Sequence, residues 1–136
     1  MTGGLFGCGE FNKKIRESRI AAAEEAIAEN PEFRETSDLC SRIPLPEGTK
    51  FVEKARLYNS VGLSYYYYSD REPEDLEKFF REYFTKNGWE PVKPDTAMAL
   101  TADFKNDKFE VAITLSGIGT DPNFTVNCEK LNTRRK

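Results

Sequence analysis

The spacing of the large apolar side chains constrains the fold of this chain more than any other feature of the sequence. In residues 73–87 these side chains recur with the i, i+3, i+4, i+7, i+8 spacing of a single helix face, at Leu76, Phe79, Phe80, Tyr83 and Phe84. Farther along, the apolar residues recur with a period of two, at Phe109, Val111, Ile113 and Leu115, which predicts a strand with one buried face. Because a helix and a sheet that are each apolar on one side bury those sides together, the pattern predicts a helix packed across a sheet.

The remaining segments fit an α+β fold, in which N-terminal helices precede the sheet and helix 73–87 packs on one of its faces. An antiparallel sheet of about five strands is predicted from strand-like segments near residues 51–55, 63–69, 100–104, 109–115 and 124–128. Asn87-Gly88 ends the helix, because glycine readily adopts the left-handed conformation of a helix end. Trp89 follows directly, and we expect it to pack in the core beside Phe80 and Phe84 rather than to bind a ligand.

We expect one domain, because 136 residues are typical of a single core. That domain is predicted over residues 31–131, with a flexible leader at 1–10 and a short tail at 132–136. Residues 11–30 are rich in alanine and predict a helix, either on the surface of the domain or as a spacer before it. Asn30-Pro31 can cap and begin a second helix.

The composition argues against several classes of function. The net charge is only −3, so we expect no nucleic-acid partner. The chain contains no histidine, which removes the Ser-His-Asp and Cys-His catalytic arrangements. Three widely spaced cysteines without histidine form no zinc pattern, and no apolar run approaches the roughly 18 residues of a membrane helix. We therefore expect a protein that is not an enzyme, that holds no metal or cofactor, and that contacts a membrane only through an anchor.

Cys8 is the candidate for that anchor. In Leu5-Phe6-Gly7-Cys8, an aliphatic residue and a small residue precede the cysteine, as in a bacterial lipid-attachment signal. The basic and apolar segments of a secretory signal do not precede this motif. Two explanations are open: the sequence begins at an internal start or a truncation and Cys8 carries a lipid, or the match is accidental and Cys8 is a free cysteine on a flexible leader.

The other two cysteines are candidates for a disulfide. Cys40 ends the second predicted helix, and Cys128 lies on the apolar side of the last strand with Phe124 and Val126. A Cys40–Cys128 bridge is expected if the protein is exported. It would close a loop of roughly 90 residues and contribute up to about 4 kcal/mol. The alternative is two buried free cysteines, which behave as small apolar residues.

Four consecutive tyrosines, Tyr65, Tyr66, Tyr67 and Tyr68, lie in a predicted strand, so we expect two on each face of the sheet. They are a candidate binding surface, because tyrosine is enriched where proteins meet. The alternative is that tyrosine is only a favourable strand residue.

The same tyrosine-rich strand begins a segment that resembles small uncharacterised bacterial envelope domains. In those domains such a strand and a serine-aspartate turn, here Ser69-Asp70, lead into a helix that ends in Gly-Trp, here Gly88-Trp89. The stretch Ile43-Pro44-Leu45-Pro46-Glu47-Gly48 is similar to them as well, and the resemblance covers residues 31–130. It implies the fold and, because many such proteins carry a lipoprotein signal, a place in the cell envelope. It implies no catalytic residues.

These observations predict a non-enzymatic domain of the bacterial cell envelope, anchored by a lipid on the periplasmic side or the cell surface. Its role would be to bind an unknown protein partner or to support an envelope structure. The alternative is a cytosolic acidic binding protein of the inhibitor or immunity type, which the acidic balance favours. A less favoured third class is a small-molecule enzyme with a pocket between helix and sheet.

Overall fold

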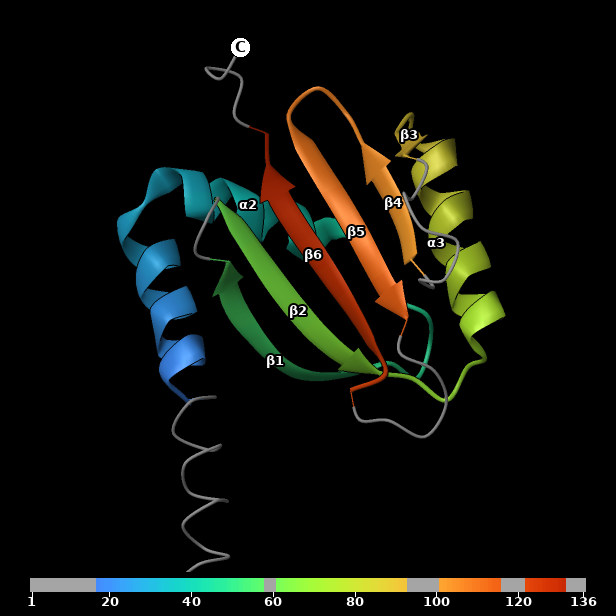
Figure 1. Cartoon of the computed structure of the whole chain (residues 1–136), viewed down its shortest axis with the longest axis horizontal. Helices are drawn as coiled ribbons and strands as arrows, with labels where there is room; N and C mark the ends of the chain where they lie inside the picture. The colour runs from blue at the N-terminus through green and yellow to red at the C-terminus, as the bar shows by residue number, and fades with distance from the viewer. Residues whose placement is uncertain (1–16, 58–60, 93–100, 116–121, 132–136) are drawn as a thin grey trace, which may run out of the picture.

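The chain forms an α+β fold with three helices and one antiparallel sheet of six strands (Figure 1). These elements come from a computed structural model that describes residues 17–57, 61–92, 101–115 and 122–131. The predicted class and the antiparallel sheet are confirmed, with six strands where about five were expected.

The strands pair in the order β1-β2-β6-β5-β4-β3. Their bounds are β1 (Lys50–Leu57), β2 (Gly62–Tyr68), β3 (Glu90–Val92), β4 (Thr101–Lys105), β5 (Phe109–Leu115) and β6 (Phe124–Lys130). All neighbouring strands run antiparallel. The last strand lies between β2 and β5, so β6 joins the first hairpin of the sheet to the second.

Two helices have sequence-encoded ends. α2 (Pro31–Arg42) begins after Asn30, whose Oδ1 accepts a hydrogen bond from the Glu32 N–H at 2.8 Å. α3 (Pro73–Lys86) ends at Asn87-Gly88, where Gly88 has a φ of 85° that other residues rarely adopt. Proline occupies the first turn of both helices, where its missing N–H costs no hydrogen bond.

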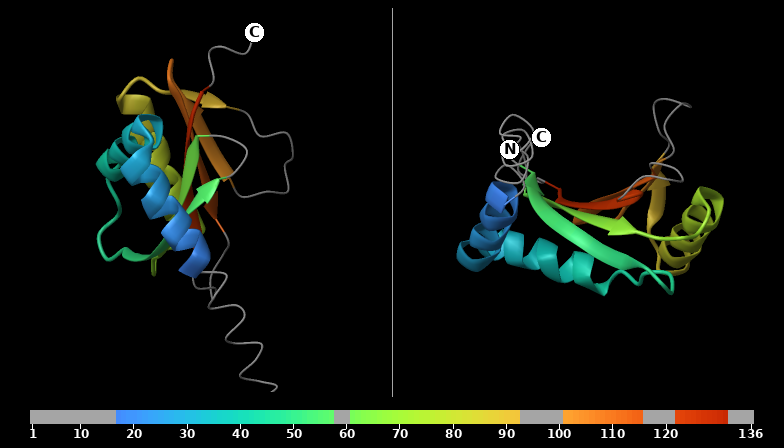
Figure 2. Two further views of the ribbon diagram at one scale, coloured as in Figure 1. Left: turned by 90° about the vertical axis from the view of Figure 1, so that its left-hand side faces the viewer. Right: turned by 90° about the horizontal axis from the view of Figure 1, so that it is seen from below.

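α2 and α3 cover the same face of the sheet, as the right-hand view of Figure 2 shows. α2 packs on β2 and β6, whereas α3 packs on β3, β4 and β5. The core lies between these helices and the sheet, and its largest fully buried side chains include Phe80, Phe84, Phe104, Phe124, Leu63 and Leu76. The opposite face of the sheet carries mostly polar residues.

A disulfide joins Cys40 of α2 to Cys128 of β6, with the two Cα atoms 6.1 Å apart and 88 residues apart in sequence. Both cysteines are buried. The predicted pairing is therefore present, and it holds the end of α2 against the central strand of the sheet.

The helix over residues 17–29 packs against the domain beside β1 (Figure 1). Its Ala23 and Ala26 are buried, and Glu24 forms an ion pair with Lys54 of β1 at 2.9 Å. These residues therefore belong to the packed domain rather than to a free spacer. The predicted leader at 1–10, the tail at 132–136 and Cys8 lie outside the described residues.

Candidate functional site

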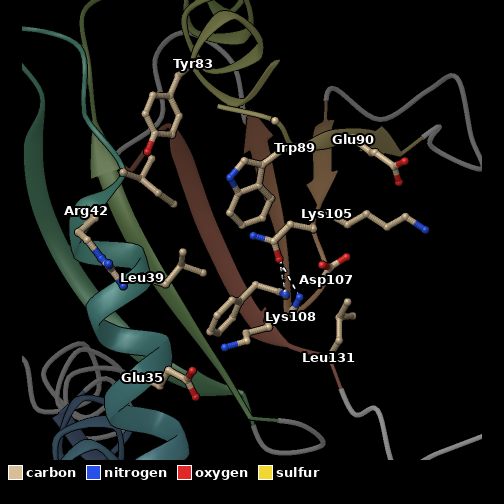
Figure 3. Close-up of a pocket in the computed structure, with 14 residues that line it drawn as sticks. Glu35, Leu39, Arg42, Tyr83, Trp89, Glu90, Lys105, Asp107, Lys108 and Leu131 are labelled. Atoms are coloured by element: carbon tan, nitrogen blue, oxygen red, sulfur yellow. Dashed lines mark hydrogen bonds between the residues drawn. The ribbon is translucent and has the colours of Figure 1, made fainter. Parts of the chain in front are cut away.

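A cavity of about 880 Å³ opens on the helix-covered face, between α2 and the C-terminal end of α3 (Figure 3). It exists because α2 packs on the β2–β6 side of the sheet and α3 packs on the β3–β4 side. The two helices leave the end of the β4–β5 hairpin uncovered between them. This α2–α3 groove is the candidate site, because ligand sites are usually concave and of roughly 300–1,000 Å³.

One wall of the groove is a single face of α2. Glu35, Leu39 and Arg42 line it, spaced four and three residues apart, so they lie one above another along the helix. The disulfide of the neighbouring Cys40 fixes this wall on β6. The position of Leu39 and Arg42 over the sheet therefore depends on a covalent bond as well as on packing.

The opposite wall comes from the end of α3 and the residues after it. Tyr83 and Trp89 are both half-buried and line the groove. The Trp89 ring packs edge-on against Phe84, with 5.1 Å between ring centroids, and the backbone N–H of Trp89 donates to the backbone carbonyl of Phe84 at 2.9 Å. Figure 3 shows the indole projecting into the space opposite Leu39. Trp89 thus packs beside Phe84 as expected, but its other side faces the groove.

The β4–β5 turn forms the floor at one end. The side-chain oxygen of Asn106 accepts hydrogen bonds from the N–H groups of Lys108 and Phe109, at 2.9 and 2.8 Å. This turn buries the Phe109 ring and leaves the Lys108 side chain exposed. Leu131, just after β6, completes the apolar lining on this side.

Charged side chains surround the apolar lining. Glu35 accepts a hydrogen bond from the Lys130 ammonium at 2.8 Å, and this bond holds the pKa of Glu35 below its ordinary value, with smaller contributions from the charges of Lys130 and Lys108. The same bond raises the pKa of Lys130. The other charged groups at the rim are Arg42, Lys105 and Lys108, together with Glu90 and Asp107.

The four tyrosines divide between the two faces of β2, as strand alternation predicts. Tyr65 and Tyr67 are buried on the helix-covered face, where burial raises the pKa of Tyr67 to about 12. Tyr66 and Tyr68 lie half-buried on the other face. None of the four lines the groove, so the structure does not bring them together with Leu39 and Trp89, and their use as a binding surface stays a prediction.

Sequence reasoning missed the groove. Its walls come from residues about fifty apart in sequence, such as Leu39 and Trp89, and neither periodicity nor spacing relates them. The one available signal was the order of the apolar residues on α2. Leu39, next to Cys40 on α2, is only partly buried, and Ile43, just after the helix, is buried.

The polar face of the sheet holds a second group of ionisable side chains. Glu110 faces Glu129 across β5 and β6, and burial followed by the charges of Asp103 and Glu129 raises the pKa of Glu110. Burial also raises the pKa of Asp103. The Oδ1 atom of Asp103 is buried and has no hydrogen-bond partner among the described residues.

We therefore expect Asp103→Asn to stabilise the protein at neutral pH by about 0.5 kcal/mol, a small gain because solvent screens this half-exposed carboxyl. A raised pKa means that the folded protein binds the proton more tightly than the unfolded chain. Stability then falls as pH rises from the ordinary pKa of 3.8 through the folded value, and asparagine removes that loss. Urea unfolding at pH 7 and pH 3 measures it.

The gain in stability of Asp103→Asn should vanish at pH 3, where the Asp103 carboxyl is protonated in both the folded and the unfolded protein. Asp107→Asn, which removes an exposed carboxylate on the adjacent turn, is the matched control and should change stability little at either pH. An Asp103→Asn variant less stable than the wild type at pH 7 would show that the carboxylate has a favourable partner.

Within the described ranges no group of three or more histidine, cysteine, aspartate or glutamate side chains could hold a metal ion. No helix among those residues is long and apolar enough to span a membrane. Comparisons of the chain with protein-family models, with curated protein sequences and with solved structures found no match.

Proposed function

We propose that this protein is a non-enzymatic binding domain of the bacterial cell envelope, anchored by a lipid on Cys8, which holds a partner protein in the α2–α3 groove. The observation that carries the proposal is the groove itself. Its walls present Trp89, Tyr83 and Arg42, the three residue types that contribute most often to protein–protein binding energy. A lining that combines apolar side chains with charged groups at the rim is also common in such interfaces.

The disulfide supports the proposed location. Cys40–Cys128 joins a helix to the central strand of the sheet, and structural disulfides persist mainly in oxidising compartments such as the periplasm and the cell surface. A cytosolic inhibitor, the alternative that the acidic balance favours, would keep these thiols reduced. The lipid anchor itself rests on the Leu5–Cys8 pattern and on the resemblance to envelope domains.

The polar groups of the groove favour binding over catalysis. Glu35 is engaged by Lys130, and the Asn106 oxygen is engaged by two backbone N–H groups of its own turn. General acid–base catalysis needs a group within hydrogen-bond reach of the reacting proton. These two groups instead hold the walls of the groove in place, so the proposal assigns no catalytic residue.

Photo-crosslinking in the host that makes the protein tests the proposal. With p-benzoylphenylalanine at position 39 in the full chain, irradiation should give one discrete protein adduct. The same group at position 78, an exposed site on α3 outside the groove, should give none. The adduct and the protein should both fractionate with membranes, and Cys8→Ser should release them into the soluble fraction.

Each outcome bears on a separate part of the proposal. Equal adducts at positions 39 and 78, or no adduct at either, would contradict binding in the groove. Unchanged membrane fractionation of Cys8→Ser, or an unmodified Cys8 mass in the native protein, would contradict the lipid anchor.

A further inference from the structure

The free polar groups of the groove are mainly hydrogen-bond donors. The Tyr83 hydroxyl, the Trp89 indole N–H and the Lys108 ammonium have no hydrogen-bond partner within the described ranges. Among the described residues, the side chain of Arg42 donates one hydrogen bond, from its Nε–H to the Asp38 carbonyl at 3.2 Å, and Arg42 is exposed. A ligand that fits these groups must therefore be rich in acceptors.

The acceptors near the centre of the groove are, in contrast, already engaged. Glu35 accepts from Lys130, and the Asn106 oxygen accepts from the turn. The two remaining carboxylates, Glu90 and Asp107, lie on the side opposite α2, and Figure 3 shows Glu90 turned away from the cavity.

Arg42 and Lys108 are two of the three cations that line the groove. Arg42 lies one turn beyond Leu39 on α2, and the Lys108 charge is close enough to Glu35 to lower the pKa of that carboxyl. Since Lys130 already pairs with Glu35, neither Arg42 nor Lys108 has a carboxylate partner within 4.0 Å among the described residues. These two cations line the same groove as Leu39 and Trp89.

We propose that the groove binds an acidic segment of a partner protein, which places one large apolar side chain between Leu39 and Trp89 and its carboxylates on Arg42 and Lys108. This inference rests on the proposed function and names the chemistry of the partner. Arginine suits the task, because its planar guanidinium binds a carboxylate through two parallel hydrogen bonds.

A peptide fits this lining better than a hydrocarbon chain does. The apolar residues of the groove come from α2, from the end of α3 and from the β4–β5 turn, and charged side chains separate them. A hydrocarbon chain would place methylene groups against those charges, which is unfavourable. A peptide can instead alternate apolar and acidic side chains to match the lining.

The chain supplies its own probe, because Trp89 is its single tryptophan and lines the groove. Its fluorescence can be followed during titration of the full chain with three capped hexapeptides that alternate leucine with glutamate, glutamine or lysine. We expect the glutamate peptide to bind at least 10-fold more tightly than the glutamine peptide. We expect the lysine peptide to bind most weakly, and the preference should weaken as salt screens the charges.

The double variant Arg42→Gln/Lys108→Gln should lose the preference and bind the glutamate and glutamine peptides alike. Lys78→Gln, which removes an exposed cation on α3 outside the groove, is the matched control and should keep it. Both changes are on exposed side chains, and circular dichroism checks that the fold is retained.

Equal binding of the three peptides, a preference for the lysine peptide, or no binding of any peptide would overturn the inference. So would decanoate binding at Trp89 without binding of the glutamate peptide, because that result would assign the groove to a lipid-like carboxylate. If such a result came with a retained protein adduct at position 39, only the acidic chemistry would fail. Loss of the adduct as well would remove the proposed function.

Discussion

Phe84→Ala is expected to lower the free energy of unfolding by about 3–5 kcal/mol, as large-to-small substitutions of buried phenylalanine do. Phe84 is completely buried. Its ring stacks on Phe104 of β4 with centroids 4.6 Å apart and meets Trp89 edge-on. Removing it would leave a cavity under α3 and take away the support of one wall of the groove. Urea unfolding followed by circular dichroism measures the loss.

Phe79→Ala is the matched control on the same helix. Phe79 is only partly buried, so its truncation should cost less than half as much as Phe84→Ala. Trp89 fluorescence of the folded proteins adds a local measurement, because only the Phe84 variant should change the surroundings of the indole. A loss below about 1 kcal/mol for Phe84→Ala would mean that α3 does not pack as described.

Removal of the disulfide is expected to have an effect of similar size. The double variant Cys40→Ala/Cys128→Ala should lose about 2–5 kcal/mol, because the bridge restricts the unfolded chain across 88 residues of sequence. Both cysteines are buried. Alanine is therefore used rather than serine, whose hydroxyl would be buried without a hydrogen-bond partner. Thermal unfolding of the oxidised wild type and of the variant measures the difference.

Two controls separate the bridge from the loss of side-chain volume. Wild-type protein that is unfolded and refolded with a reductant should have nearly the same stability as the variant. The remaining difference should reflect only the packing lost with the two sulfur atoms. Cys8→Ala should leave stability unchanged. An unfolding midpoint that is the same with and without reductant would show that the bridge does not form in the protein.

The sequence carried most of the information on the elements of the fold. Helix 73–87 was predicted one residue longer than α3, because its apolar spacing, its first proline and its final glycine are all local signals. β5 alternates buried and half-buried residues along its whole length, so its period of two was equally direct. The apolar positions of Cys40 and Cys128 were compatible with a bridge or with two buried free cysteines, and the structure shows the bridge.

The relative placement of the helices could not be predicted in the same way. Periodicity assigned an apolar face to α3 but did not indicate which part of the sheet each helix covers. α2 and α3 share one face and lie apart on it, which leaves the groove between them. The four tyrosines are adjacent in sequence, but Tyr65 and Tyr67 are buried in the core and lie apart from the groove.

Local signals in the chain therefore specify its helices, its strands and which side of each is buried, because periodicity and helix ends depend on residues a few positions apart. The groove depends on contacts that span far more sequence, namely α2 bound to β6 through Cys128 and Trp89 held against Phe84. Those contacts form only when the sheet has assembled in the order β1-β2-β6-β5-β4-β3. Tertiary packing alone brings Leu39, Arg42, Lys108 and Trp89 into one site.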